Sequence, residues 1–318
     1  MKNFADRLID TIGKKKNPSI IGLDTELLKV PGFLRDKYAG KHGDSFEAAS
    51  LCILEFNRRL IDSLKAVVPA VKIQSAFYEQ YGFHGVKAFM ETAEYAKAAG
   101  LIVVGDVKRN DIGNTSRAYS KAYLGRSEVF SEKRPAFDLD CITVNPYLGT
   151  DGVAPFVEDV KEFGKGIFVL VKTSNPSSSE LQNLEAGLKS ERKKIYEVVA
   201  ELVRKWGEGT AGKMGYNSVG AVVGATFPEE AKKLRKIMEK AVFLVPGYGA
   251  QGGGAGDAAN CFNPDGYGAI VHSARDVIYA FQKSGGKEED FAAAAKAAAM
   301  KMKEDLTTAL EERKICPW

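Results

Sequence analysis

The residues best suited to chemistry lie in one short segment, which begins Asp106-Val-Lys108 and reaches a second carboxylate at Asp111. The segment directly follows the apolar run 101–105, so a strand that is buried at its start is predicted to end in charge. Side chains alternate between the two faces of a strand, which places Asp106 and Lys108 on the face of Val104. Taken alone, an Asp-x-Lys pair favours a structural ion pair, because unpaired buried charge is costly.

Chemistry based on histidine or cysteine is poorly supported. The three histidines, His42, His84 and His272, have no second histidine or cysteine at metal-ligand spacing, and no GxSxG motif suggests a Ser-His-Asp triad. The four cysteines form no CxxC pair, so neither a zinc knuckle nor a disulfide framework is indicated. We find no flavin, pyridoxal or metal motif, and we therefore predict no metal and no cofactor. Each histidine is interpreted as a surface or packing residue.

The elements that must position the charged segment repeat along the chain. Short β-branched runs alternate with amphipathic helical patterns, and near-continuous hydrophobicity in the runs indicates strands buried on both faces of a parallel sheet. This alternation predicts an α/β fold, a (β/α)₈ TIM barrel, with residues 1–318 as a single domain. A doubly wound open sheet is the alternative, but the first strand leads into Asp24-Thr-Glu instead of a glycine fingerprint. The predicted strands are 19–24, 70–74, 101–108, 138–145, 166–173, 219–225, 242–246 and 267–273. The helices predicted most clearly are 45–66, 87–99, 191–206, 228–240 and an Ala-rich helix 288–314 that covers the barrel.

The composition is that of an ordinary globular protein, with 318 residues, 45% hydrophobic and 27% charged. A net charge of +4 without a dense basic block argues against nucleic-acid binding. No apolar run is long enough to span a membrane, and the N-terminus lacks the apolar core of a signal peptide. These features predict a cytoplasmic protein without a membrane partner.

Polar residues recur where the predicted strands end, and barrel enzymes carry their sites at the carboxyl ends of the strands. After strands seven and eight, Gln251 and Arg275 offer donors for a phosphate, and the glycine-rich stretch 251–257 can fold over it as a lid. Several polar strand ends on one rim therefore predict a site. Its residues are Asp24, Lys72, Gln74, Asp106, Lys108, Asn145, Thr173, Ser174, Gln251, Ala274 and Arg275.

The motif Asp106-x-Lys108-x-x-Asp111-Ile-Gly-Asn-Thr115 resembles the signature of the orotidine 5'-phosphate decarboxylase family. The resemblance covers nearly the whole chain, and the length is similar to that of the longer bacterial or protozoan-like branch. Asp24 and Lys72 match the family's other strand-end charges. Thr173-Ser174 matches the position that contacts the pyrimidine. The phosphate site is matched by Pro246-Gly-x-Gly-x-Gln251 and by Ala274-Arg275, where the family usually has Gly-Arg.

The resemblance implies the conversion of orotidine 5'-phosphate to UMP and CO₂ in pyrimidine biosynthesis. Lys108 would stabilise the charge that develops at C6 and then protonate it, without a cofactor. Asp106 would orient Lys108, while Lys72 neutralises the charge array and holds the ribose with Asp24. In the family, Asp111 and Thr115 reach into the neighbouring subunit's site. This implies a homodimer with shared active sites.

Two other interpretations remain open at this point. Metal-dependent sugar-phosphate decarboxylases and aldolases share DxKxxD, but they need a carboxylate at the end of the second strand, where this chain has Lys72. A non-catalytic nucleotide-binding barrel would need a phosphate grip, but not Lys108 among three acidic residues. Loss of activity with EDTA would favour the first alternative.

Overall fold

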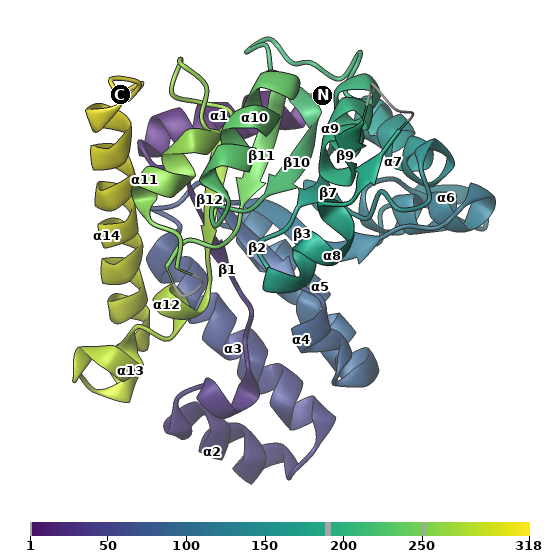
Figure 1. Cartoon of the computed structure of the whole chain (residues 1–318). Coiled ribbons are helices and arrows are strands. Elements are labelled where there is room, and N and C mark those ends of the chain that lie inside the picture. Colours follow the sequence, from purple (N-terminus) through teal and green to yellow (C-terminus); the bar gives the residue numbers. More distant parts are fainter. Residues whose placement is uncertain (1, 188–191, 250–251) are drawn as a thin grey trace.

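The computed structural model describes residues 2–187, 192–249 and 252–318. Eight parallel strands close into a barrel that helices surround (Figure 1). Each barrel strand pairs with the next barrel strand along the chain, and β12 closes on β1. This confirms the predicted (β/α)₈ fold class. The barrel strands are β1 (Ser19–Gly22), β2 (Ala70–Gln74), β3 (Ile102–Arg109), β6 (Cys141–Val144), β7 (Gly166–Lys172), β10 (Asn217–Val223), β11 (Ala241–Val245) and β12 (Ala269–Ser273).

The predicted strand positions agree with the structure to within a few residues. The largest difference is in β6, which was predicted from residue 138 and begins at Cys141. Asp138 has a positive φ of 49°, which is incompatible with a strand, and its carboxylate pairs with Lys97 and Lys165. Asp140 accepts a hydrogen bond from the backbone N–H of Val103 and pairs with Arg7. These two aspartates belong to the amino-terminal end of the barrel.

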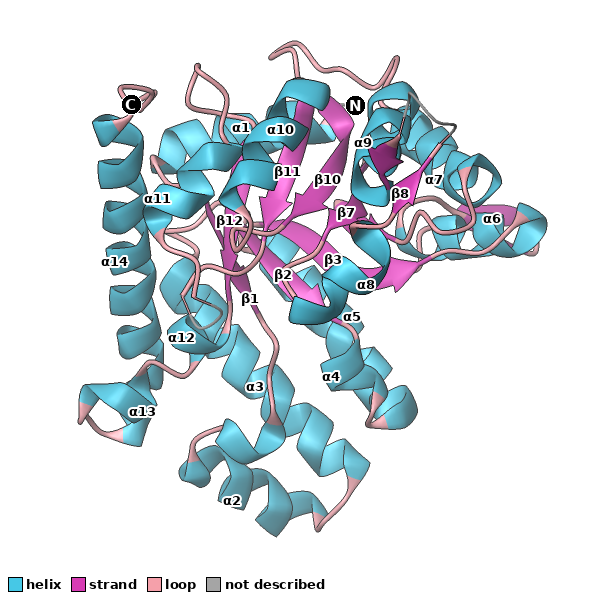
Figure 2. Ribbon diagram, in the orientation of Figure 1, coloured by secondary structure: helices cyan, strands magenta, loops and turns pink. Residues whose placement is uncertain are grey.

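Helices fill the connections between the strands (Figure 2). Helix α3 begins after Ser45, whose hydroxyl accepts from the N–H of Ala48, as an N-cap residue should. Helix α10 begins at Pro228 after Phe227, and no side chain caps its first turn. The helices are α1 (Phe4–Lys15), α2 (Gly32–His42), α3 (Phe46–Leu64), α4 (Ala76–Glu79), α5 (Gly82–Ala98), α6 (Gly113–Tyr123), α7 (Thr150–Phe163), α8 (Ser179–Gln182), α9 (Ile195–Trp206), α10 (Pro228–Ile237), α11 (Ala255–Ala258), α12 (Arg275–Ile278), α13 (Phe281–Ser284) and α14 (Phe291–Glu312).

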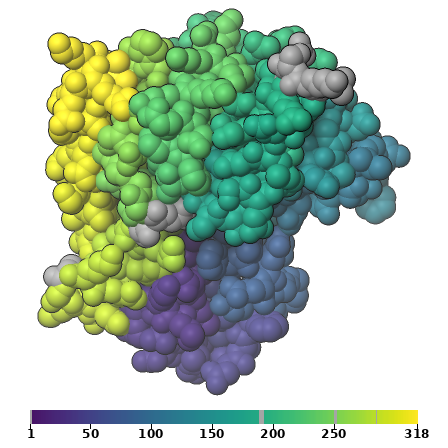
Figure 3. Space-filling model, viewed as in Figure 1, coloured from purple at the N-terminus to yellow at the C-terminus, as the bar shows by residue number. Residues whose placement is uncertain are grey.

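The Ala-rich helix α14 covers the barrel, as predicted. It packs against α3, α11, α12 and β1, and it forms one flank of the molecule, yellow in the space-filling view (Figure 3). None of the described helices is both long and apolar enough to cross a membrane.

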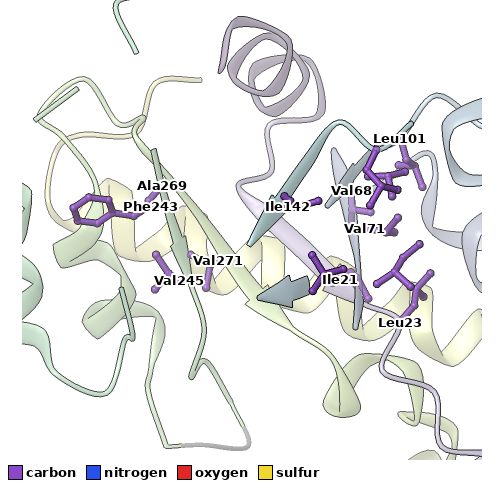
Figure 4. Packing of buried hydrophobic residues seen from close by; sticks show 14 of the residues in the cluster. Ile21, Leu23, Val68, Val71, Leu101, Ile142, Phe243, Val245, Ala269 and Val271 are labelled. Atoms are coloured by element: carbon purple, nitrogen blue, oxygen red, sulfur yellow. The ribbon is translucent and has the colours of Figure 1, made fainter. Parts of the chain in front are cut away.

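Two apolar layers hold the barrel together. The inner layer joins inward-facing strand residues, among them Ile102, Val104 and Phe168, to one face of α1. Helix α1, which the sequence did not suggest, thereby closes the amino-terminal end of the barrel. The outer layer packs the other faces of the strands against the surrounding helices, and Figure 4 shows members such as Ile21 and Val271. Because the inner layer fills the barrel towards its amino-terminal end, space for a ligand remains at the carboxyl ends of the strands.

Several short elements interrupt the regular alternation. Strands β4 (Ser127–Val129) and β5 (Glu132–Arg134) form a hairpin between α6 and β6, and β8 (Glu185–Ala186) pairs with β9 (Lys193–Lys194) before α9. Single 3₁₀ turns are η1 (Leu27–Lys29), η2 (Pro176–Ser178), η3 (Ala259–Cys261) and η4 (Glu288–Asp290). Of these elements, η2 follows the end of β7 and contributes to the candidate site.

Candidate active site

A cavity of about 300 Å³ opens at the carboxyl ends of the strands. Its walls come from all eight barrel strands or from the loops that directly follow them. The predicted residues that line it are Asp24, Lys72, Gln74, Asp106, Lys108, Thr173, Ser174 and Pro246. The other lining residues are Thr143, Leu170, Asn175, Val222, Leu244 and His272. Its charged groups therefore lie on one side of the barrel, on β1, β2 and β3.

The Asp106 carboxylate is the centre of this charged group. One oxygen accepts from Lys72 Nζ at 2.8 Å and from Gln74 Nε2 at 2.9 Å. The other accepts from Lys108 Nζ at 2.6 Å and from Thr143 Oγ1 at 2.9 Å. Lys72 Nζ also lies 3.3 Å from Asp24 Oδ1. Carboxylate and ammonium side chains thus alternate through Asp24, Lys72, Asp106 and Lys108, so that each group contacts one of opposite sign.

Burial and neighbouring charges shift the pKa values of Asp106 and Lys72 in opposite directions. Burial disfavours a charged Asp106, but the two lysine ammonium groups outweigh it and hold the pKa of the carboxyl far below its usual value. Burial alone would also lower the pKa of Lys72, yet the carboxylates of Asp106 and Asp24 raise it. Asp106 is therefore a carboxylate and Lys72 an ammonium throughout the physiological pH range. Removal of either group would leave the other buried without its main partner, and this would lower the free energy of unfolding by a few kcal/mol.

Lys108 differs from Lys72 in its exposure and its backbone. Its side chain is 46% exposed, against 5% for Lys72, so its ammonium is accessible from the cavity. Its φ is +46°, in the left-handed region, and the pairing of β3 with β6 shifts register between Gly105 and Arg109. The backbone N–H of Lys108 donates to Thr143 Oγ1 at 2.9 Å, which holds this conformation. Backbone strain of this kind costs about 1–3 kcal/mol and concentrates at functional sites.

Thr143 is a site residue that sequence reasoning missed. We predicted Asn145 at the end of this strand, but β6 ends at Val144, and Asn145 is exposed, with its side chain accepting from the N–H of Tyr147. Asn145 does not line the cavity. The signal for Thr143 was its parity with Cys141, which lies in the inner layer of the barrel.

His272 was also missed, because we interpreted each histidine as a surface or packing residue. It lies on β12, two positions after the inward-facing Ile270, and lines the cavity beside the charged array. Burial and the nearby Lys72 ammonium lower the pKa of His272 to about 3, so the imidazole is neutral at physiological pH. Its alternation with Ile270 would have predicted an inward-facing side chain.

The buried neutral His272 predicts a pH dependence of stability. The unfolded chain takes up this proton near pH 6.5 and the folded protein only near pH 3, so the free energy of unfolding falls as the pH decreases from 6.5 towards 3. Relative to His272→Leu, the wild type should lose up to about 1 kcal/mol per pH unit across this window. Urea unfolding of both proteins at pH 7 and pH 5 measures the difference. His84→Leu, which removes a histidine outside the cavity, is the matched control. A difference in the free energy of unfolding between wild type and His272→Leu that is the same at pH 7 and pH 5 would contradict the prediction.

Lys172, the last residue of β7, anchors the segment that follows this strand. This lysine is fully buried, and its ammonium donates to Ser178 Oγ at 3.2 Å and to Asn183 Oδ1 at 2.9 Å. The ammonium also lies 4.3 Å from the ring centroid of Phe227, and burial lowers the pKa of Lys172. Gln182 accepts from the Thr173 N–H at 3.0 Å and donates to Thr173 Oγ1 at 2.8 Å. Thr173 is thereby fixed at the mouth of the cavity.

Asp111, Thr115, Ala274 and Arg275 do not line the cavity of this chain. Arg275 is exposed and is the first residue of α12, with Ala274 as its N-cap, as predicted for a helix start. Asp111 is partly buried, its carboxylate accepting from the N–H of Ile112, and Thr115 is exposed on α6. Gln251 lies outside the described residues. Within the loop after β11, Tyr248 donates its hydroxyl to Asp305 on α14 at 3.0 Å, which ties this loop to the covering helix.

Comparisons with known proteins agree on one family. The family model described as "Orotidine 5'-phosphate decarboxylase / HUMPS family" matches residues 44–269. An orotidine 5'-phosphate decarboxylase of Caldicellulosiruptor bescii is 44% identical over 310 residues, covering 98% of this chain and 100% of the relative. One from Rhodopirellula baltica is 42% identical, covering 96% and 99%.

Solved structures with a similar fold carry related names. The OMP decarboxylase of Leishmania donovani superposes with a TM-score of 0.70 at 26% identity, covering 96% of this chain and 98% of that one. The UMP synthase of Leishmania donovani gives a TM-score of 0.72 at 28% identity, covering 96% of this chain and 57% of that longer one. The fold of this chain is therefore shared with these solved structures.

Proposed function

The chain belongs to the orotidine 5'-phosphate decarboxylase / HUMPS family, and from this premise we propose how its strand-end cavity works. It is a carboxy-lyase of pyrimidine biosynthesis, which converts orotidine 5'-phosphate to UMP and CO₂. The observation that carries the proposed mechanism is the alternation of charge through Asp24, Lys72, Asp106 and Lys108. Loss of CO₂ from C6 leaves an electron pair on carbon, and fixed charges can stabilise it without solvent reorganisation.

Lys108 is the group that acts on C6. Its ammonium is the more accessible of the two in the array, and it is oriented by the Asp106 carboxylate at 2.6 Å. As the C6–CO₂ bond breaks, the electron pair stays on C6 opposite this positive charge. Lys108 then transfers its proton to C6, CO₂ leaves, and the product UMP carries hydrogen where the carboxylate was.

Asp106 and Lys72 keep Lys108 in place and in charge balance. Asp106 accepts four hydrogen bonds, so its orientation is over-determined, and it holds the Lys108 ammonium on the cavity side of β3. The nearly buried Lys72 compensates the charge of Asp106 and, with Asp24, presents polar atoms to a ribose. A network in which every polar group has a hydrogen-bond partner is rigid. Electrostatic catalysis requires such preorganisation.

The position of Lys72 separates this site from those of metal-dependent relatives. An oxygen-ligand metal site needs carboxylates that are free to coordinate. Here the carboxylates of Asp24 and Asp106 both contact the ammonium of Lys72 instead. Among residues 2–187, 192–249 and 252–318, no group of three or more His, Cys, Asp or Glu residues is placed to hold a metal.

The rest of the nucleotide is assigned to the neighbouring strand ends. Thr173 and Ser174 lie at the mouth of the cavity and can bind the pyrimidine, beside Pro246. Arg275, at the start of α12, is assigned to the phosphate together with the backbone N–H groups there and with Gln251. Gln74 belongs to the array through its bond to Asp106.

We further assign Asp111 and Thr115 to the site of a second copy. Both follow β3 but lie outside this chain's own cavity. Near them the surface is apolar, with Ile112, Tyr147 and Leu148 at 57%, 78% and 47% exposure. Helix α7, which begins three residues after Tyr147, contacts this segment, since Ser116 Oγ donates to the carbonyl of Gly152 at 2.8 Å. An exposed apolar surface beside unpaired site residues supports a homodimer with shared sites.

Two coarser assignments complete the proposal. Residues 1–318 form one barrel domain, because the inner apolar layer runs continuously from α1 to β12. The substrate and product are metabolites of the cell interior, which places the enzyme in the cytoplasm, with no membrane or nucleic-acid partner.

The decisive experiment follows the ultraviolet absorbance of orotidine 5'-phosphate mixed with the purified protein. We expect conversion to UMP with release of CO₂, at the same rate before and after dialysis against EDTA. Absence of conversion would overturn the proposed function. Conversion that EDTA abolishes, and that a divalent metal restores, would overturn the metal-free mechanism.

Arg275→Ala should mainly raise KM for orotidine 5'-phosphate. Loss of a charge-assisted hydrogen bond to phosphate costs about 1.5–3 kcal/mol, which corresponds to about a 10- to 100-fold increase. Steady-state kinetics measure this, and calorimetry should show weaker UMP binding with little change for uridine, which has no phosphate. Arg134→Ala, on the exposed β4–β5 hairpin, is the control. An unchanged KM would argue against the phosphate assignment.

A further inference from the structure

His272 is a polar side chain of the cavity to which the proposed mechanism gives no role. His272 lies on β12 among the residues that line it, facing the array from the opposite side of β1. Its Nε2 atom is fully enclosed and has no hydrogen-bond partner. The other ring nitrogen, Nδ1, is not enclosed in this way. A buried polar atom without a partner is uncommon in a folded protein and calls for a functional explanation.

The enclosure of Nε2 depends on a glycine on the neighbouring strand. A Cβ atom on Gly22 would lie 2.4 Å from His272 Nε2 and 2.7 Å from the Cβ of Ala274. The same point is 3.0 Å from Asp24 Oδ1, so the imidazole lies next to the carboxylate assigned to the ribose. The absence of a side chain at residue 22 thus creates the space that the ring occupies. Nε2 therefore lies against β1, which leaves Nδ1 as the ring nitrogen available to the cavity.

The position of His272 along a bound nucleotide follows from its neighbours. Arg275, assigned to the phosphate, comes three residues later at the start of α12. Lys108, assigned to C6 of the pyrimidine, lies across the barrel, and Lys72 and Asp24 lie between the two. In a nucleoside monophosphate the ribose connects phosphate and base. The wall between these two grips is formed by Asp24, Lys72 and His272, so His272 faces the ribose.

We propose that His272 is a further substrate-binding residue, whose Nδ1 forms a hydrogen bond with a ribose hydroxyl of the nucleotide. This rests on the proposed function and deepens it by adding a residue that selects for ribose. An enclosed acceptor without a partner is less costly than an enclosed donor, which favours the lone pair on Nε2 and the N–H on Nδ1. The imidazole then donates to the hydroxyl oxygen, while the hydroxyl hydrogen remains available to Asp24. An uncharged donor here leaves the charge balance of the array unchanged.

The test compares the binding of UMP, 2'-deoxy-UMP and 3'-deoxy-UMP by calorimetry to wild type, His272→Leu and His272→Asn. The wild type should bind one deoxy analogue distinctly more weakly than UMP. In His272→Leu the ratio of the dissociation constant of that analogue to the dissociation constant of UMP should fall about five- to tenfold, the equivalent of one neutral hydrogen bond. His272→Asn, whose amide lies at the position of Nδ1, should retain most of the ratio. If His272→Leu fails to fold, His272→Gln, which has a polar atom only at the position of Nε2, carries the same expectation.

The outcomes separate this inference from the function on which it rests. Ratios for both analogues that are the same in wild type and in folded His272→Leu would overturn the ribose contact alone, while UMP binding and turnover persist. Failure of the wild type to bind UMP would overturn the proposed function and the contact together. A loss that affects UMP and both analogues equally would show that the ring only shapes the cavity, and would also overturn the contact.

Discussion

Lys108→Ala is expected to bind UMP within about tenfold of wild type and to lose turnover by at least about 10⁴-fold. The substitution removes two contributions at once. General acid catalysis contributes about 10²–10⁴-fold, and a preorganised charge opposite the developing carbanion about 10²–10³-fold. Binding should survive because Lys72, Asp24 and the phosphate grip are untouched. The fold should also survive, because Asp106 keeps three of its four hydrogen bonds.

Turnover at saturating orotidine 5'-phosphate and calorimetry with UMP measure the two effects separately. Lys108→Arg retains the positive charge but is a very poor proton donor, so it should recover only the electrostatic part. Lys133→Ala, on the exposed β4–β5 hairpin, should behave as wild type. Turnover of Lys108→Ala within tenfold of wild type would rule out the proposed mechanism.

Mixing two inactive variants is expected to restore activity. If Asp111 serves the partner's site, a dimer of one Lys108→Ala chain and one Asp111→Ala chain contains one site with both substitutions and one with neither. Random exchange at equal amounts makes half of the dimers hybrid, so about a quarter of the sites are intact, in a two-fold symmetric dimer. Activity should therefore rise from near zero to about a quarter of wild type.

The matched control mixes Lys108→Ala with Lys72→Ala. Both residues line the same chain's cavity, so each site of that hybrid lacks one of them and activity should not recover. Co-expression with two different affinity tags isolates the hybrids, and sedimentation verifies that they are dimers. Purified Lys108→Ala/Asp111→Ala hybrids without activity would contradict the shared site. A monomeric, fully active wild type would do so as well.

Much of the site was predictable because a strand has a simple geometry. The alternation of Val104, Asp106 and Lys108 follows from a period of two residues, and the apolar run before them marks the strand. Lys72 and Gln74 follow from the same argument on β2, where they pair in register with Val104 and Asp106. These residues needed only the knowledge that parallel strands end at one rim.

The errors arose where a strand ends or shifts register. Asn145 was expected in the cavity because the strand was extended by one residue beyond Val144, and the inward position belongs to Thr143. His272 was judged by its residue type and not by its parity with Ile270. The helix α1 was missed, although its apolar face closes the barrel.

The sequence by itself determined the order of strands and helices, the barrel class, and the candidate lysines and carboxylates at the strand ends. Hydrophobic periodicity and residue type are local properties, so they can be read from the sequence without knowledge of the fold. Only the tertiary structure decided that Asp106 receives four donors from three strands, and that His272 fits beside a glycine on the neighbouring strand. Register, strand ends and strand closure depend on packing between distant segments, so these contacts exist only once the barrel has closed.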